Sequence, residues 1–208
     1  MKKYIILPIF ALLTSSLLVS CSEGGDFYLE QSIFIQDPAN PGLPIYSEWG
    51  YNTFGVFVNR QPFISNRNHL PAQIIVYPDT MNLIMTGVQG NTTRRTVLTF
   101  SFIGYTPRTY SDLIALNGVT IDLTDRTRSI VTLTETIGFQ EITTELIPFN
   151  GEFTFNRVQN LVVDNELDKS IISGRFRFQT RYRNEYVTFD RGRFDFAIGF
   201  DNFFYIPR

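Results

Sequence analysis

The chain has 208 residues, 18 basic and 20 acidic side chains, and a net charge of −2 at pH 7. Without a basic excess, this composition excludes nucleic acid binding that depends on net positive charge, and we expect no nucleic acid partner. Hydrophobic residues make up 43% of the chain and include 20 Phe and 10 Tyr, so a core held by packing alone is feasible.

Residues 1–20 have the layout of a secretory signal peptide. Lys2 and Lys3 are cationic, Tyr4–Ser20 is almost wholly apolar, and Cys21 follows a Leu-Val-Ser sequence. Small residues before a cysteine resemble the lipobox, where the signal peptide is cleaved and the cysteine thiol receives a diacylglyceryl group. We expect Cys21 to be the lipidated first residue of the mature protein, carrying fatty acyl chains such as palmitate.

The alternative is a retained transmembrane helix. The 17 residues of Tyr4–Ser20 lie at the lower limit of about 17–25 for a membrane span. No basic stop-transfer cluster follows, because residues 22–26 are acidic and polar. Ser22, where an inner-membrane retention signal would have Asp, favours the outer membrane. We expect a lipid-anchored protein of the cell envelope, on the periplasmic or the surface face, with the membrane as its first partner.

The residue types predict an all-β fold. Removal of residues 1–20 leaves 188 residues with a net charge of −4, four Ala and a single Lys, Lys169. Strong helix formers are therefore scarce, whereas Thr, Phe, Tyr, Ile and Val are abundant. Cys21 is the only cysteine, so the fold has no disulfide. We expect an antiparallel β-sandwich, or a barrel-like sandwich, of roughly 9–12 strands.

Three segments follow in chain order: the signal peptide 1–20, a lipidated tether 21–45, and a β domain 46–208. Phe27–Gln36 is a candidate first strand and Asp37–Pro44 a Pro-rich loop. Short alternating segments within the domain predict strands at Thr53–Asn59, Ala72–Tyr77, Leu83–Val88, Arg95–Ile103, Val119–Leu123, Val131–Leu133 and Phe153–Phe155.

Two further elements have local signals of their own. Thr109–Leu116 predicts a helical turn that Ser111 caps and that ends at Asn117-Gly118. Ser173–Tyr182 predicts one strand of a hairpin that turns at 183–185. The apolar alternation changes parity on the return strand, which predicts a β-bulge near 190–192 and places Arg175 opposite Asp195.

Three segments of the domain resemble a known group of proteins. Gly55–Phe63 reads GVFVNRQPF, Ile172–Phe178 reads ISGRFRF, and Thr188–Asp195 reads TFDRGRFD. They are similar to the small β-rich lipoproteins of unknown function that are common in Bacteroidetes-type bacteria. The chain departs from that pattern at Arg60, where Gly is frequent, and at Arg191, which is inserted before a glycine. The resemblance implies a fold and a location, and it brings no catalytic residue.

Several catalytic classes find little support. His69 is the only histidine and Cys21 is expected to be acylated, which excludes zinc sites built from several His or Cys ligands. A hydrolase triad would need His69, which lies in a polar loop sequence, and no Gly-x-Ser-x-Gly motif is present. We predict no catalytic residue of this kind, no cofactor and no resident metal.

A glycan hydrolase would need only two carboxylates, about 5–10 Å apart across a cleft. The candidates are Glu48, Asp122, Asp190 and Asp195. Any chain with 20 acidic residues offers such pairs, and the simpler interpretation is that these side chains face outward from strands.

Two further segments have candidate roles. Asp164–Asp168 is either a hairpin turn, which is the simpler interpretation, or a calcium-binding loop. Asp79-Thr80-Met81 resembles a bacterial O-glycosylation site at Thr80.

Two groups of side chains are candidate ligand contacts. Tyr46, Trp49 and Tyr51 can stack on a sugar or an apolar ligand, or can cover one end of the core. Arg175, Arg177, Arg181 and Arg183 form a stripe that can bind anionic polysaccharide or lipid headgroups. The alternative is that Asp190, Asp195 and Glu185 neutralise this stripe.

The sequence therefore predicts a non-enzymatic binding module or an accessory, structural subunit. Its partner would be an envelope protein or a surface glycan. The alternative is a glycan-binding or glycan-hydrolysing lipoprotein that uses aromatic and carboxylate side chains.

Overall fold

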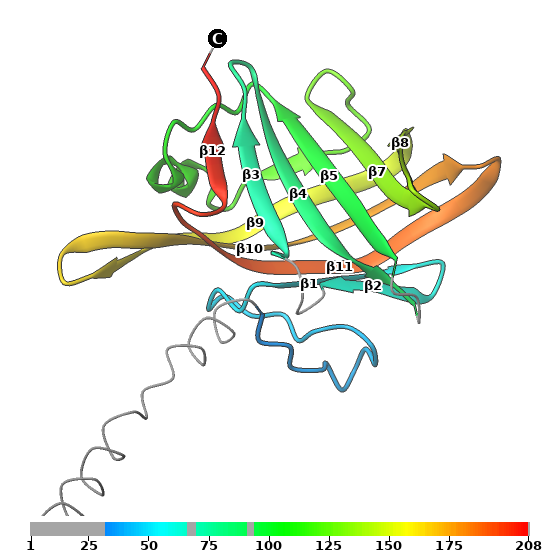
Figure 1. The fold of residues 1–208 in the computed structure, drawn as a ribbon, viewed down its shortest axis with the longest axis horizontal. Coiled ribbons are helices and arrows are strands. Elements are labelled where there is room, and N and C mark those ends of the chain that lie inside the picture. The colour runs from blue at the N-terminus through cyan, green and yellow to red at the C-terminus, as the bar shows by residue number, and fades with distance from the viewer. Residues whose placement is uncertain (1–31, 66–69, 91–93, 208) are drawn as a thin grey trace, which may run out of the picture. The chain divides into compact units, whose positions relative to one another are not determined.

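The computed structural model describes residues 32–65, 70–90 and 94–207. In these residues twelve strands form one sheet, which curls into a half-barrel (Figure 1). The prediction of an all-β fold is confirmed, and the strands belong to a single curled sheet. One short 3-10 helix, η1 (Tyr110–Leu116), lies against β9 and β10.

The strands are β1 Thr53–Val58, β2 Gln61–Ser65, β3 Ala72–Val76, β4 Thr80–Gln89, β5 Arg95–Ile103, β6 Thr120–Asp122, β7 Ser129–Ile137, β8 Gln140–Leu146, β9 Pro148–Val163, β10 Glu166–Tyr182, β11 Glu185–Ile198 and β12 Phe203–Tyr205. Their order in the sheet is β6-β9-β10-β11-β1-β2-β4-β5-β7-β8, with antiparallel neighbours throughout. β3 pairs with β4, and β12 adds to β3 in parallel.

Side chains join the two ends of the curled sheet. β8 and β9 are separated by one residue, Ile147, although they lie near opposite ends of the strand order. Glu135 on β7 accepts a hydrogen bond from the Tyr182 hydroxyl and pairs with Arg183 at 2.7 Å. The Thr180 hydroxyl donates to the Ile147 carbonyl at 2.9 Å. Hydrogen bonds of side chains therefore bridge β7 to the end of β10.

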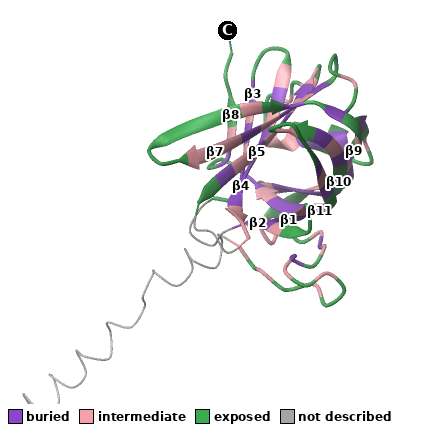
Figure 2. Cartoon of the chain, turned by 90° about the vertical axis from the view of Figure 1, so that its right-hand side faces the viewer, coloured by how far each residue is buried: buried purple, intermediate pink, exposed green. Residues whose placement is uncertain are grey.

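Phenylalanine rings fill the concave side of the sheet. The Phe153 ring centroid lies 4.7 Å from that of Phe100, 5.1 Å from Phe102 and 5.0 Å from Phe194. These rings alternate with polar residues along β5, β9 and β11, and this alternation directs them to one face. Buried residues accordingly line the inner side of the curl (Figure 2). These rings form a packed core. A hollow of about 360 Å³ beside it is lined by Leu133, Tyr182, Val187 and Phe189, and larger hollows lie on the outer face, which is therefore the stronger candidate for ligand binding.

Two-residue turns connect three of the hairpins. Both central residues have positive φ at Asn59-Arg60, Asp164-Asn165 and Arg183-Asn184, the geometry that matches the twist of paired strands. Asp164-Asn165 thus joins β9 to β10, which confirms the hairpin at this position. Arg60 stands at φ 72°, a conformation in which glycine is least strained.

The predicted β-bulge is confirmed, but the pairing derived from it is wrong. Phe176 lies opposite Gly192 and Phe178 opposite Phe189, so β11 carries one extra residue around Arg191, whose φ is 54°. A single extra residue shifts the register by one position only. Arg175 therefore lies opposite Arg193, and Asp195 lies opposite Ser173.

Two local predictions also need correction. The described part of the candidate first strand, residues 32–36, makes only an isolated bridge between Gln36 and Pro44. The helical turn is present as η1, but Ser111 does not cap it. The Asp112 carboxylate accepts hydrogen bonds from the backbone N–H groups of Thr109 and Arg108, both at 3.0 Å. A carboxylate accepts hydrogen bonds from the N–H groups at the start of a helix more strongly than a hydroxyl does, because its negative charge interacts favourably with the helix dipole.

Removal of a phenylalanine ring should destabilise the protein much more in the core than on the surface. Phe153→Ala should lower the free energy of unfolding by about 3–5 kcal/mol, because it opens a cavity among several rings. Phe139→Ala removes the same side chain from the fully exposed β7–β8 turn and should change stability by less than about 0.5 kcal/mol. Urea unfolding of both variants measures this, and equal effects would contradict the assignment of the core.

Candidate binding groove on the outer face

A groove crosses five neighbouring strands on the outer face of the sheet. It consists of three adjoining hollows of about 720, 230 and 500 Å³ that share lining residues. The first and second share Thr188 and Asp190, and the second and third share Asn150, Gly151 and Arg177. The groove therefore runs from β1 over β11, β10 and β9 to β6, across the strand direction.

Polar side chains dominate the lining of this groove. Outward positions on antiparallel strands bring residues from distant parts of the chain onto one surface. Asn150 on β9 lies opposite Gln179 on β10, and Gln179 lies opposite Thr188 on β11. The amide and hydroxyl groups are Asn59, Asn150, Gln179, Thr120, Thr124 and Thr188, and the aromatic rings include Phe57 and Phe149.

Charged groups in the groove are mostly paired. Arg177 binds Glu152 at 3.0 Å across β9 and β10, and the Arg191 guanidinium lies 3.5 Å from the Asp190 carboxylate. Among the described residues, Arg60 at the β1 end and Arg128 at the β6 end make no ion pair, and Arg128 donates to the Tyr105 hydroxyl at 3.4 Å. The groove thus offers hydrogen bond donors and acceptors along its length, with a guanidinium that lacks a carboxylate partner at each end.

Asp122 lies at the other end of the groove, on β6. Its carboxylate accepts hydrogen bonds from the Thr124 backbone N–H at 2.8 Å and the Thr124 hydroxyl at 2.7 Å. These bonds stabilise the ionised form and hold the pKa of Asp122 below its ordinary value. Asp122 is therefore a hydrogen bond acceptor at neutral pH.

An exposed aromatic pair flanks the groove. Phe149, at the start of β9, meets Tyr186 on β11 edge to face, with ring centroids 5.9 Å apart. Both rings are largely exposed, and the Arg181 guanidinium lies 5.3 Å from the centroid of the Tyr186 ring. This predicted ligand-contact arginine therefore makes a cation–π contact with one ring of the pair.

Residues 33–51, which we call the strap, cover the outer face next to the groove. The strap is held by Asp195 on β11, whose side chain is almost wholly buried. This carboxylate accepts hydrogen bonds from the Ser47 hydroxyl and from the backbone N–H groups of Trp49 (3.2 Å), Gly50 (2.8 Å) and Tyr51 (3.0 Å). Its acceptor capacity is used structurally, which removes Asp195 from the candidate catalytic acids.

A second ion pair holds the other end of the strap. Arg193 binds Asp37 at 2.5 Å, and both side chains are largely buried. The Asp37 carboxylate also accepts from Asn40 at 2.6 Å and from the Ala39 N–H at 2.9 Å. The bond from Asn40, then that from Arg193, lowers the pKa of Asp37 to about 2. Arg191 donates to Asn40, which joins the strap to the groove wall.

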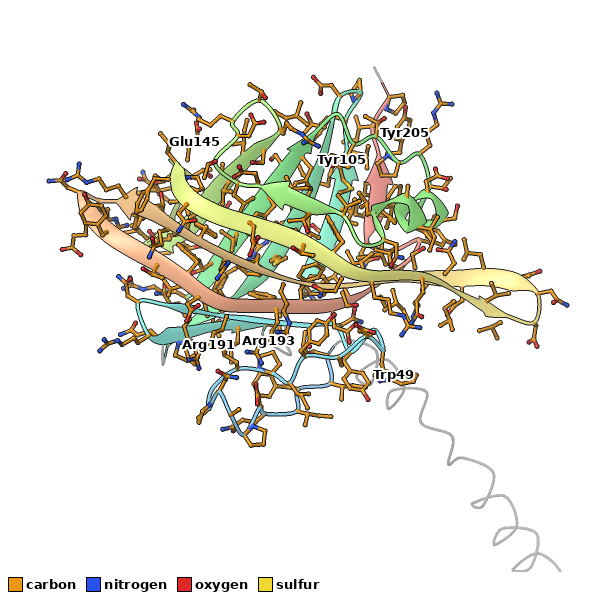
Figure 3. The ribbon with its side chains drawn as sticks, turned by 180° about the vertical axis from the view of Figure 1, so that it is seen from behind. Trp49, Tyr105, Glu145, Arg191, Arg193 and Tyr205 are labelled. Carbon is orange, nitrogen blue, oxygen red and sulfur yellow. The ribbon has the colours of Figure 1, made fainter. Side chains whose placement is uncertain are left out.

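The predicted aromatic cluster lies on the strap, and its members differ in exposure. The Tyr46 hydroxyl donates to Glu48 at 2.9 Å, and Arg175 lies 4.8 Å from the Tyr46 ring centroid. Burial, and then Glu48, raises the pKa of Tyr46 to about 12. Tyr51 is half-buried, whereas Trp49 is 75% exposed at the end of the strap (Figure 3).

The arginine stripe has partners other than the predicted ones. Arg175 lies over Tyr46, Arg177 binds Glu152, and Arg183 binds Glu135. Of the four candidate carboxylates, Asp122 and Asp190 line the groove, whereas Asp195 lies beneath the strap. Glu48 binds Arg157 at 3.1 Å.

The other candidate residues lie elsewhere. Thr80 begins β4, and its hydroxyl donates to Asp79 at 3.0 Å. Cys21 and His69 fall outside the described residues. No group of three or more His, Cys, Asp or Glu side chains is placed to hold a metal ion in the part of the chain that the structure describes.

The sequence did not identify most of the groove. Asn150, Gln179 and Thr188 come from three strands, and only the strand order and register place them together. Arg177 was predicted to contact an anionic polysaccharide or lipid headgroups, and Asp122 and Asp190 were candidate carboxylates of a glycan hydrolase, but the sequence did not place the three on one groove. The polar alternation on β10 was the one signal that marked this face as outward.

Comparisons with protein-family models, with curated proteins and with solved structures find no match to this chain. The resemblance to small β-rich envelope lipoproteins therefore stays a prediction. Within residues 32–65, 70–90 and 94–207, no helix has the length and apolar character needed to cross a membrane.

The buried Asp195 predicts a large effect from a nearly isosteric change. Asp195→Asn replaces one acceptor oxygen by an NH₂ group and leaves buried backbone N–H groups without a partner, at a cost of about 3 kcal/mol. Asp190→Asn, on the exposed part of the same strand, should cost less than about 0.5 kcal/mol. Urea unfolding compares the two variants, and a harmless Asp195→Asn would contradict the role given to Asp195.

The Asp37–Arg193 pair predicts a pH-dependent contribution to stability. The pKa of Asp37 lies below its ordinary value of 3.8, so its contribution is complete above that pH and is lost as the pH falls toward about 2. The difference in urea midpoint between the wild type and Asp37→Asn should be constant from pH 7 to about 5, and shrink between about pH 4 and pH 2. A difference independent of pH would contradict this role.

Proposed function

We propose that this protein is a lipid-anchored binding module of the cell envelope that holds an extended glycan in the outer groove. The observation that supports this most is the continuous row of amide and hydroxyl groups across β1, β11, β10, β9 and β6. The groove is long and open, which suits a chain-like ligand better than a compact cofactor.

The chemistry of the lining suits sugars. Each sugar hydroxyl donates and accepts hydrogen bonds, so amide side chains such as Asn150 and Gln179 are suitable partners. The Phe149–Tyr186 pair beside the groove offers ring faces or edges to the apolar side of a sugar ring. The unpaired Arg60 would favour a glycan that carries acidic groups.

The anchoring part of the proposal rests on the leader sequence and Cys21. A lipid at Cys21 would keep the domain at the membrane, where long polysaccharides of the envelope are concentrated. We place the protein at the outer membrane on the residue after Cys21 and on the resemblance to envelope lipoproteins.

Binding is favoured over hydrolysis by the state of the carboxylates in the groove. A glycosidase needs a general acid whose pKa is raised. The hydrogen bonds from Thr124 lower the pKa of Asp122, the opposite direction, and Glu152 is ion-paired with Arg177. Glycan hydrolysis is the second hypothesis. It predicts that the protein releases new reducing ends from a polysaccharide that it binds.

A glycan microarray tests the proposal directly. The wild type should bind one or more glycans, and Asn150→Ala with Gln179→Ala should weaken that binding by about thirtyfold, because two hydrogen-bonding amides are lost. The control is Gln73→Ala with Gln140→Ala, which removes two amides from β3 and β8, away from the groove. Absence of wild-type binding, or equal loss in both double variants, would contradict the proposal.

A further inference from the structure

The strap exposes four large hydrophobic side chains. Their exposed fractions are 41% for Ile33, 47% for Ile35, 40% for Ile45 and 75% for Trp49. These residues come from two stretches of the chain that lie side by side. The Ile45 N–H donates to the Ile35 carbonyl at 2.7 Å, and the Ile33 N–H donates to the Tyr51 carbonyl at 2.8 Å.

The three isoleucines project from the same side of the strap. Gln36 forms an antiparallel bridge with Pro44, so Ile35 and Ile45 lie directly opposite each other. Side chains of opposite residues share a face, and Ile33 shares the face of Ile35 because two residues separate them. Phe34, between them, is half-buried. Trp49 stands at the end of the strap in the side-chain view (Figure 3).

The strap presents this apolar face with its carboxylates already paired. Residues 33–51 contain two charged side chains, Asp37 and Glu48. Arg193 binds the first at 2.5 Å and Arg157 binds the second at 3.1 Å. Both arginines come from the sheet, on β11 and β9. A surface of this kind can approach a lipid headgroup layer without repulsion by a free carboxylate.

The chain itself limits how far this face can lie from the anchor. Cys21 precedes Ser32, the first described residue, by 11 positions. A fully extended segment of that length reaches at most about 40 Å. Ser32 adjoins Ile33, which is bonded to Tyr51, two residues from Trp49. Any lipid on Cys21 therefore holds the membrane surface within reach of the exposed strap residues.

We propose that the strap docks on the lipid surface, with Trp49 in the interfacial region and the isoleucines Ile33, Ile35 and Ile45 beside it. This inference rests on the proposed anchoring at Cys21. Tryptophan favours this region because its ring is apolar and its N–H can remain hydrated. Docking would fix the orientation of the domain, since the strap is bonded rigidly to β11 through Asp195 and Arg193.

Trp49 is the only tryptophan, so its fluorescence reports this contact without interference. The lipidated full-length protein is reconstituted in vesicles of phosphatidylcholine and phosphatidylglycerol, with or without brominated acyl chains. Brominated lipid should reduce Trp49 emission about twofold. The reference for iodide quenching is the protein without its acylated N-terminus, in detergent-free buffer. Relative to this reference, quenching of Trp49 by aqueous iodide should be about threefold weaker in the vesicle-bound protein.

The matched control moves the reporter to a different part of the sheet. Trp49→Phe with Phe139→Trp carries a single tryptophan on the fully exposed β7–β8 turn. This tryptophan should stay open to iodide and insensitive to brominated lipid. Equal lipid quenching at both positions would mean that the domain has no fixed orientation and would overturn the proposal.

Each remaining outcome has a defined meaning. Mass spectrometry of the N-terminal peptide first determines whether Cys21 is acylated. An unmodified Cys21, with a product whose membrane binding is unchanged by Cys21→Ser, overturns the anchor and the docking together. An acylated protein whose Trp49 remains open to iodide overturns the docking alone. Protection of Trp49 from iodide without quenching by brominated lipid would mean that the strap contacts another copy of the protein. This outcome would also overturn the docking on lipid.

Discussion

One buried carboxylate determines the organisation of the outer face. Asp195 accepts three backbone N–H groups and one hydroxyl from the strap, and these donors lie on consecutive or nearly consecutive residues. Such an arrangement fixes the backbone of residues 47–51 against β11, because each N–H would otherwise be buried without a partner. The strap covers one part of the sheet as a result, and the groove occupies the part left open.

The inner face explains why the outer face is the functional candidate. A curled sheet of twelve strands can enclose a ligand cavity, but here phenylalanine rings such as Phe100, Phe153 and Phe178 fill the space. Stacking and edge-to-face contacts between these rings stabilise a closely packed interior, and the polar side chains that line the proposed groove lie on the convex side. Along β9, β10 and β11, inward side chains therefore pack the core, and the outward side chains that alternate with them line the proposed groove.

The sequence predicts local features of this fold well and long-range pairing poorly. Alternation located β5, β7 and the β10–β11 hairpin, and the change of parity located the bulge near Arg191, because both signals lie within a few residues. Arg175 was paired with Asp195 wrongly, since register depends on the count of residues across the turn. β2 was missed because Pro62 is typical of a turn, and β12 because it has only three residues. The groove could not be predicted because it exists only once the strand order is known.

The arginines of the sheet show why a charge pattern alone does not define a site. Arg157 and Arg193 lie on neighbouring parts of the outer face, yet both bind carboxylates of the strap and make its surface compatible with lipid. Arg177 is held by Glu152, and Arg175 by the ring of Tyr46. What each cation can bind is decided by the partner that the fold supplies. Among the described residues, the guanidinium groups of Arg60 and Arg128 line the groove without a carboxylate partner, and they lie at its opposite ends, so an extended ligand would meet a cation at each end.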